Sequence, residues 1–400
     1  MLQTFRKAFQ IEDIRRKILY TLAMLFVVRL GSQLPTPGVD PTYIQNFFAN
    51  QTGDSFNFFN AFTGGSFETM SIFALSITPY ITSSIIIQLL TIAIPKLEEM
   101  QKEGEDGRKK LTALTRYVTV VLALIESTAM AVGFGRQGLL EKFNFVNAAI
   151  VVLTLTAGSA FLMWIGERIT EKGVGNGISI VLLINILSRI PSDMTSLYEK
   201  FISGKGLASG GLAAIIIIAI ILVLVVFTVI LQDAERRIPV QYSQKVQGRK
   251  SVGGQSTNIP LKVNTAGVIP VIFASSIMSM PVMIAQFFHV DYSTIGGKIL
   301  LALSSSNWFK PEAPAYSIGL LVYIVLVVLF AYFYTSITFN PLEVANNMKK
   351  SGGFIPGIRP GKETADFLAR TVRRITFWGA VFLAIMALPT IISISQDALA

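Results

Sequence analysis

Cysteine is absent from this 400-residue chain, which excludes disulfides, thiolate metal sites and cysteine nucleophiles. Histidine occurs once, as His289, near the end of an apolar stretch. We expect it to lie at a membrane interface rather than to act as a base or a metal ligand. Sequence motifs of zinc hydrolases, serine hydrolases and P-loop nucleotide-binding proteins are also missing. The sequence therefore predicts no enzyme, no cofactor and no bound metal.

Charged residues are scarce as well, at 14% of the chain against 52% hydrophobic residues, which is unlike a soluble protein. The apolar residues occur in blocks close to the ~20 residues that a helix needs to cross a bilayer. Within lipid, a helix of this length satisfies its own backbone hydrogen bonds. We therefore predict an all-α polytopic membrane protein whose spans are 18–34, 71–94, 111–135, 146–168, 177–191, 211–232, 264–288, 315–339 and 374–394.

The net charge of +10 is unevenly distributed, because Lys and Arg concentrate at the N-terminus and in the even-numbered connections between spans. By the positive-inside rule this pattern places the N-terminus in the cytoplasm. Two cytoplasmic connections, about 233–263 and 340–373, are long and basic. Alternating polar and apolar residues around a central Gly-Gly predict a protruding hairpin in the first. These connections could be merely solvated and orienting, but their length and Gly/Pro content favour docking surfaces.

The connection between the first two spans contains no Lys or Arg and faces outward by the same rule. It is rich in phenylalanine and continues into Thr63-Gly64-Gly65. One interpretation is an interfacial half-helix with aromatic anchors. The other is a re-entrant element folded into a protein-lined cavity, since apolar half-helices at membrane depth must be shielded by protein.

The second and seventh spans each contain a proline near the middle and a serine pair shortly after it: Pro79 with Ser83-Ser84, and Pro270 with Ser275-Ser276. Ordinary kinks with packing serines would explain either span alone. Their matched positions, five spans apart, indicate pseudo-symmetry about a central pathway. Glu126 is a candidate for a polar contact between helices, with hydroxyls such as that of Thr82.

The sequence resembles the SecY family of protein-export channels in six stretches that occur in the family's order. They are LPTPGVD (34–40), SIFALSITPYITSSIIIQLL (71–90), EGEDGRKKLTALTRY (103–117), GERITEKGVGNGISI (166–180), KVNTAGVIPVIFASSI (262–277) and FNPLEVANNMKKSGGFIPGIRPG (339–361). The resemblance implies two pseudo-symmetric halves, here 1–191 and 192–400, that open sideways at a lateral gate. It also implies ten spans, so the tenth helix is expected to be absent from this chain.

Residue by residue, the resemblance implies four sites. They are a pore ring (Ile77, Ile81, Ile178, Leu182, Ile272), a plug at about 57–66 (Phe58, Phe59, Phe62, Gly64, Gly65), the lateral gate (Pro79, Thr82, Ser83, Pro270, Ser275, Ser276) and docking positions for the motor ATPase SecA and the ribosome (Arg249, Lys250, Arg359).

The resemblance further implies the membrane partners SecE and SecG, and a place in the bacterial cell membrane. The expected substrates are signal peptides and nascent polypeptides. A secondary transporter of a small solute is the alternative, and it would need polar or charged ligands at the midplane instead of an aliphatic ring.

Overall fold

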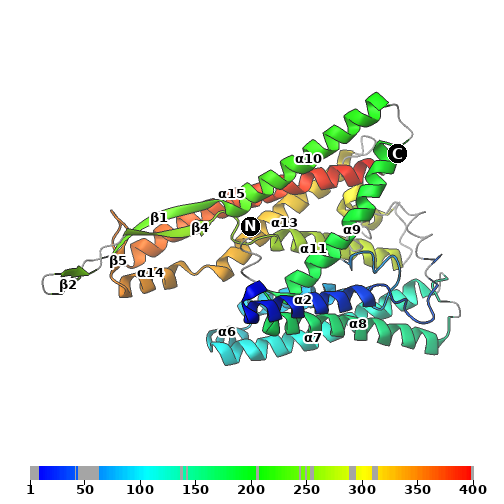
Figure 1. Ribbon diagram of the computed structural model, residues 1–400, viewed down its shortest axis with the longest axis horizontal. Coiled ribbons are helices and arrows are strands. Elements are labelled where there is room, and N and C mark those ends of the chain that lie inside the picture. The colour runs from blue at the N-terminus through cyan, green and yellow to red at the C-terminus, as the bar shows by residue number, and fades with distance from the viewer. Residues whose placement is uncertain are drawn as a thin grey trace. The chain divides into compact units, whose positions relative to one another are not determined.

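The computed structural model describes residues 9–40, 42–43, 63–135, 138–140, 143–203, 207–242, 245–247, 250–252, 256–287, 294–308 and 314–397. The chain is mostly helical and divides into two compact units (Figure 1). The first comprises Met1–Lys200 with Met283–Val290, and the second comprises Phe201–Val282 with Asp291–Ala400. The pseudo-symmetric relation between two halves stays a prediction.

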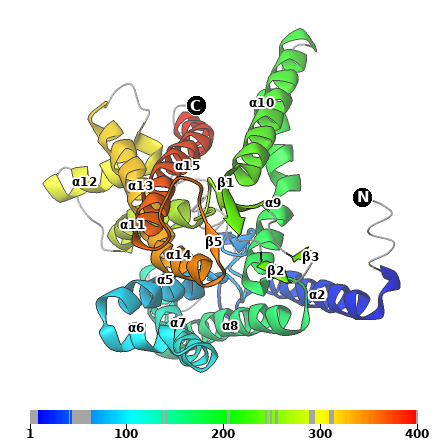
Figure 2. The same cartoon turned by 90° about the vertical axis from the view of Figure 1, so that its left-hand side faces the viewer.

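The first unit is built from helices packed side by side. They are α2 (Glu12–Gly31), α5 (Thr78–Ala93), α6 (Pro95–Lys102), α7 (Glu105–Gly133), α8 (Phe145–Lys172) and α9 (Gly177–Phe201). Helix α7 packs against both α5 and α8, and α2 packs against α8 (Figure 2). The core of the unit lies between these helices and the turns that precede α5.

The second unit combines long apolar helices with short strands. Its elements are α10 (Leu207–Asp233), β1 (Glu235–Tyr242), β2 (Lys245–Gln247), β3 (Lys250–Val252), β4 (Ser256–Lys262), α11 (Ile269–Phe287, of which the part through Val282 belongs here), α12 (Ile295–Leu303), η2 (Ser305–Asn307), η3 (Pro314–Ser317), α13 (Ile318–Thr338), α14 (Pro341–Lys350), β5 (Gly353–Phe354) and α15 (Lys362–Asp397). Helix α13 packs against α15.

Each of the nine predicted spans overlaps a helix. Among the described residues, six helices are long and apolar enough to cross a membrane, or seven if the bent pair α5 and α6 counts as one span. Helix α2 is not among them, because its first turns carry several charges, and the apolar helix at Ile269–Val282 is shorter than the others. The fifth span was predicted too short, since α9 continues through Pro191 to Phe201.

The second span begins later than predicted. Residues 63–77, which we name the turn segment, form a run of hydrogen-bonded turns, and the helix begins only at Thr78. Pro79 therefore lies in the first turn of α5, and Pro270 is the second residue of α11. Both were predicted near mid-span. A proline suits the first turn because the N–H that it lacks would have no helical partner there.

The two long basic connections form a single folded body. The predicted hairpin is confirmed, because β1 pairs antiparallel with β4 from Glu235 to Gln241. Strand β5 of the second connection pairs with the other edge of β1, which gives a three-stranded sheet in the order β4-β1-β5. Helix α15 begins at Lys362, within the predicted second connection. We name strands β1 to β5, α14, the turn between β5 and α15 and the first turns of α15 the sheet module (Figure 1).

Candidate functional site

Four of the five predicted pore-ring residues lie together in the first unit. Ile77, Ile81, Ile178 and Leu182 belong to one hydrophobic cluster, whose buried centre includes Val28, Phe73, Leu162, Ile165, Ile169 and Val181. Ile77 is itself 1% exposed and precedes the first residue of α5, and the N–H of Ile81 donates a hydrogen bond to its carbonyl (3.1 Å). Ile77 and Ile81 thus reach the cluster from the N-cap and the first turn of α5, and Ile178 and Leu182 reach it from α9.

Ile272, the fifth predicted ring residue, lies in the first turn of α11 in the second unit. It is partly buried, like Ser275 and Ser276 on the same helix. Ser275 forms a hydrogen bond with the Tyr323 hydroxyl of α13. The assignment of Ile272 to a ring stays a prediction.

The predicted gate residues of α5 differ in what they contact. Ser83 is fully buried, and its hydroxyl donates a hydrogen bond to the carbonyl of Thr115 on α7 (2.7 Å). It therefore fastens α5 to α7 within the first unit. Thr82, one residue earlier, is only partly buried. Pro79 is buried at the start of the helix.

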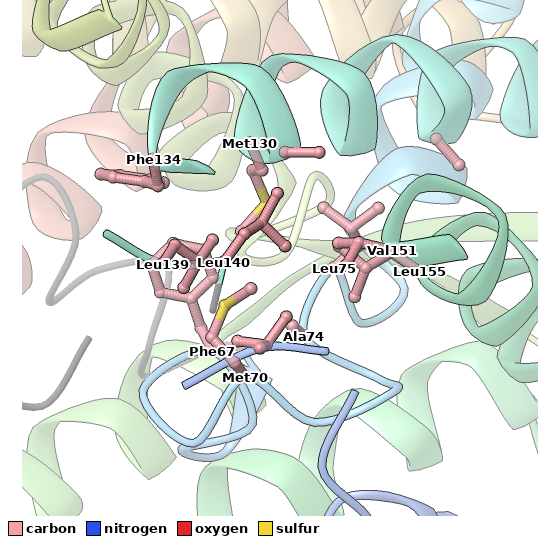
Figure 3. Packing of buried hydrophobic residues seen from close by; sticks show 13 residues of the cluster. Phe67, Met70, Ala74, Leu75, Met130, Phe134, Leu139, Leu140, Val151 and Leu155 are labelled. Atoms are coloured by element: carbon pink, nitrogen blue, oxygen red, sulfur yellow. The ribbon is translucent and has the colours of Figure 1, made fainter. Parts of the chain in front are cut away.

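The turn segment follows directly on the predicted plug. Phe58, Phe59 and Phe62 lie outside the described residues, while Gly64 and Gly65 begin the segment with φ of 66° and 83°. Figure 3 shows how the segment is anchored: Phe67, Met70, Ala74 and Leu75 pack against Met130 and Phe134 at the end of α7 and against Val151 and Leu155 of α8.

The chain after α2 pairs with this segment through its backbone. The N–H of Thr36 donates to the carbonyl of Met70, and the N–H of Ile72 donates to the carbonyl of Leu34, both at 2.9 Å. The LPTPGVD stretch therefore supports the turn segment through backbone hydrogen bonds.

The polar contact predicted for Glu126 is not seen among the described residues. The part of the chain that the structure describes contains no hydrogen bond or ion pair from Glu126 to Thr82 or to any other residue. One polar link between helices in this unit is the ion pair of Arg116 on α7 with Glu167 on α8 (2.7 Å). Glu167 is largely buried and Arg116 is about half exposed.

Two of the three predicted docking residues, Arg359 and Lys250, belong to the sheet module. Arg359 is exposed in the turn between β5 and α15, and Lys250 begins β3. Arg249 lies outside the described residues. The module has its own core: Ile238 and Val240 of β1 and Leu261 of β4 pack with Met348, Ile355 and Leu368 from the second connection. Because strand side chains alternate between faces, β1 buries one face and exposes the other.

Asn185 of α9 is a site residue that the sequence analysis missed. It is 2% exposed, and its side chain donates a hydrogen bond to Ser76 of the turn segment (3.1 Å). Its spacing could have revealed it, because residues 178, 182 and 185 share one helix face. An asparagine on the same face as two predicted ring residues is a polar group at membrane depth that requires a partner.

Three comparisons extend this description. A family model described as SecY matches residues 71–398. The protein translocase subunit SecY of Streptomyces scabiei is 45% identical over 402 residues, which covers 97% of this chain and 89% of that relative. A solved structure described as showing that the plug domain of the SecY protein stabilises the closed state has a TM-score of 0.63 at 19% identity, covering 93% of this chain and 84% of that chain. Sec61 in the canine ribosome-channel complex has a TM-score of 0.56 at 15% identity, covering 96% and 92%. The two structures establish a likeness of fold.

Proposed function

This chain belongs to the SecY family, and from that premise we propose that it is the channel-forming subunit of a protein-export translocon. It passes unfolded secretory polypeptides across the membrane and releases hydrophobic segments sideways into lipid. The observation that carries the proposal is the cluster in which Ile77, Ile81, Ile178 and Leu182 meet. These are aliphatic side chains where a small-solute transporter would need polar ligands.

An aliphatic constriction suits a polypeptide channel for a physical reason. A narrow apolar passage sheds water, so it resists ions, while branched side chains can move aside for an extended chain. Ile81, Ile178 and Leu182 are only partly buried, which leaves them surface to offer to such a chain. Ile272 completes the ring from the second unit in this proposal.

Lateral release requires two helices that separate. We assign the gate to α5 and α11, whose polar residues Thr82, Ser275 and Ser276 are partly buried. Small polar side chains allow close helix packing with hydrogen bonds that can be exchanged. A hydrophobic segment would leave the channel between these helices and enter the lipid.

In this proposal, partners that bind the sheet module supply the force for transport. SecA or a ribosome would bind its exposed basic residues, including Arg359, and SecE and SecG would accompany the chain in the membrane. The Sec61 structure described above as a ribosome-channel complex supports the ribosome as a partner. The excess of Lys and Arg in the module supports a position for it, with the N-terminus, on the cytoplasmic side of a bacterial cell membrane.

The absence of cysteine allows a direct test, because each engineered cysteine is then the only thiol. Single cysteines are placed at Ile81 and Ile178, and at Ile215, an apolar residue of α10 that is 68% exposed. A secretory chain stalled during transport, carrying a thiol-reactive crosslinker, should join to the first two positions and spare the third. Crosslinking only at Ile215 would refute the channel.

The same constriction predicts ion leakage in a planar bilayer. Ile81→Gly removes a branched side chain from the cluster and should raise the resting conductance. Unchanged conductance in a complex that still assembles would contradict the ring.

A further inference from the structure

Helix α12 of the second unit exposes two large apolar side chains on one face. Ile295 is 81% exposed, and Ile299, one helical turn later, is 57% exposed. Because residues four apart share a helix face, the two side chains lie next to each other. Gly297, on the opposite face, is buried. In Figure 2 the helix extends to one side of α13. Its apolar face is therefore directed away from the protein.

The last turn of α12 is firmly attached to the unit. The side chain of Asn307 donates a hydrogen bond to the carbonyl of Leu301 (3.0 Å). Nε1 of Trp308 donates a hydrogen bond to the carbonyl of Ala302 (2.9 Å). Both carbonyls lie at a helix end, where the helix itself provides no donor. A Cβ atom on Gly319 of α13 would lie 1.8 Å from that same Ala302 oxygen, so the two helices meet where only glycine fits.

Trp308 connects this attachment to the interior of the unit. It is 2% exposed, and its ring centroid lies 5.5 Å from that of Tyr323 on α13. The hydroxyl of Ser317 donates a hydrogen bond to its carbonyl (2.6 Å). Tyr323 forms a hydrogen bond with Ser275 of α11. Helix α12 is therefore joined to α13, and through Tyr323 to α11.

Helix α12 is fixed at the end of a spanning helix. Helix α13 is among those long and apolar enough to cross a membrane. Its exposed apolar residues form a stripe along one face: Ile318, Leu321, Val325 and Leu329. Gly319, which meets α12, belongs to the first turn of α13, at the end opposite α14. The apolar face of α12 is therefore held at the level where the stripe begins, which is where a membrane surface lies.

The charge on α12 suits the surface of a bilayer. Lys298 is exposed and lies on the same side of the helix as the two isoleucines, and α12 contains no Asp or Glu. A lysine can lay its aliphatic stem along apolar surface while its ammonium group reaches the polar layer. Helices with an apolar face and a cationic edge lie in the plane of the interface and are attracted to anionic lipids.

We propose that α12 is an interfacial anchor that binds the second unit to the surface of the lipid bilayer. Ile295 and Ile299 insert between acyl chains, and the ammonium group of Lys298 binds the phosphate groups of anionic phospholipids. A free phosphate ion would leave both isoleucines in water, so the partner is the lipid surface itself. The side of the membrane rests on the proposed function, which puts this anchor on the face opposite the sheet module.

The absence of cysteine allows nitroxide labels at single positions of the complete complex in vesicles of phosphatidylethanolamine and phosphatidylglycerol. Oxygen concentrates in lipid, whereas a nickel chelate stays in water. For labels at Ile295→Cys and Ile299→Cys, the ratio of oxygen to nickel collisions should be several-fold higher than for Phe354→Cys, an exposed apolar residue of the sheet module. Leu321→Cys, on the stripe of α13, provides the lipid-facing reference.

A charge reversal tests the role of the lysine. Lys298→Glu should lower the oxygen-to-nickel ratio of the label at Ile295, because the carboxylate is repelled by anionic lipid. The loss should be smaller in vesicles of phosphatidylcholine alone. Lys298→Arg keeps the charge and should keep the ratio. An unchanged ratio in Lys298→Glu would refute the proposed binding of phosphate groups.

Two other results would overturn the anchor. Nickel collisions at Ile295 and Ile299 equal to those at Phe354 would show that this face lies in water. Protection of both labels from oxygen and nickel alike would show that a protein, such as a second copy of this chain, covers the face. None of these measurements depends on transport. Labels in lipid together with no crosslink to a stalled secretory chain would refute the proposed function and leave the anchor in place.

Discussion

Replacing Gly158 with alanine should destabilise the first unit, because α8 meets the turn segment at this residue without space for a side chain. A Cβ atom on Gly158 would lie 1.9 Å from the carbonyl oxygen of Ile72, against the 3.0 Å below which such contacts essentially never occur. It would also approach a ring carbon of Phe73 to 3.3 Å. The obstructing oxygen is backbone, held in a segment that is itself anchored at both ends, so it cannot rotate away.

The magnitude follows from two opposing effects. Forcing an extra carbon into a packed core costs about 1–3 kcal/mol. Alanine in place of glycine within a helix returns about 0.5–1 kcal/mol, because the unfolded chain has fewer conformations to lose. We therefore expect the free energy of unfolding to fall by up to about 2.5 kcal/mol.

The matched control is Gly211→Ala in α10, where a Cβ atom would meet nothing within 4 Å. It makes the same chemical change without the steric cost, so stability should be unchanged or higher by up to about 1 kcal/mol. Unfolding of each purified protein in lipid-detergent micelles with increasing denaturing detergent would measure both. Equal stability of the two variants would refute the close approach of α8 to the turn segment.

Three further predictions concern ion pairs and the sheet module. Arg116→Ala and Glu167→Gln should each cost about 1 kcal/mol of stability, since Arg116 is half exposed; fully additive losses in the double variant would show that the pair does not interact. Leu368→Ala should destabilise the sheet module by about 2–5 kcal/mol, because this side chain is 0% exposed; limited proteolysis should then cut the module faster, and an unchanged rate would contradict its shared core. Arg359→Glu should weaken binding of SecA or ribosomes at low salt with a smaller effect at high salt and unchanged stability; a loss that does not depend on salt would exclude an electrostatic role.

The positions of the spans could be predicted because insertion into lipid depends on local composition. A block such as that of α10 contains enough consecutive apolar residues to identify a helix without any knowledge of its neighbours. The alternation of polar and apolar residues in β1 similarly predicted the hairpin. A strand with one buried face shows this alternation in its own sequence, whatever its neighbours are. The aliphatic residues of α9 were placed on one face by their spacing alone.

The start of α5 could not be located in this way. Residues 71–77 are as apolar as the helix that follows. The hydropathy of the sequence therefore predicted that the span includes them. The helix does not extend to residues before Thr78 because Met70 and Ala74 pack against α7 and α8 and because the backbone of Ser76 is left-handed. Pro79 was the available signal, since proline favours the first turn of a helix over its middle.

The amino-acid sequence by itself determined that this protein spans a membrane many times and where its apolar helices lie, because both follow from residues adjacent in the chain. The tertiary structure alone decided that the two basic connections share one sheet, and that Ser76 meets Asn185. Those two residues are 109 positions apart, and β5 reaches β1 from beyond α13. Contacts of this kind depend on how distant segments pack, which no local pattern of residues specifies.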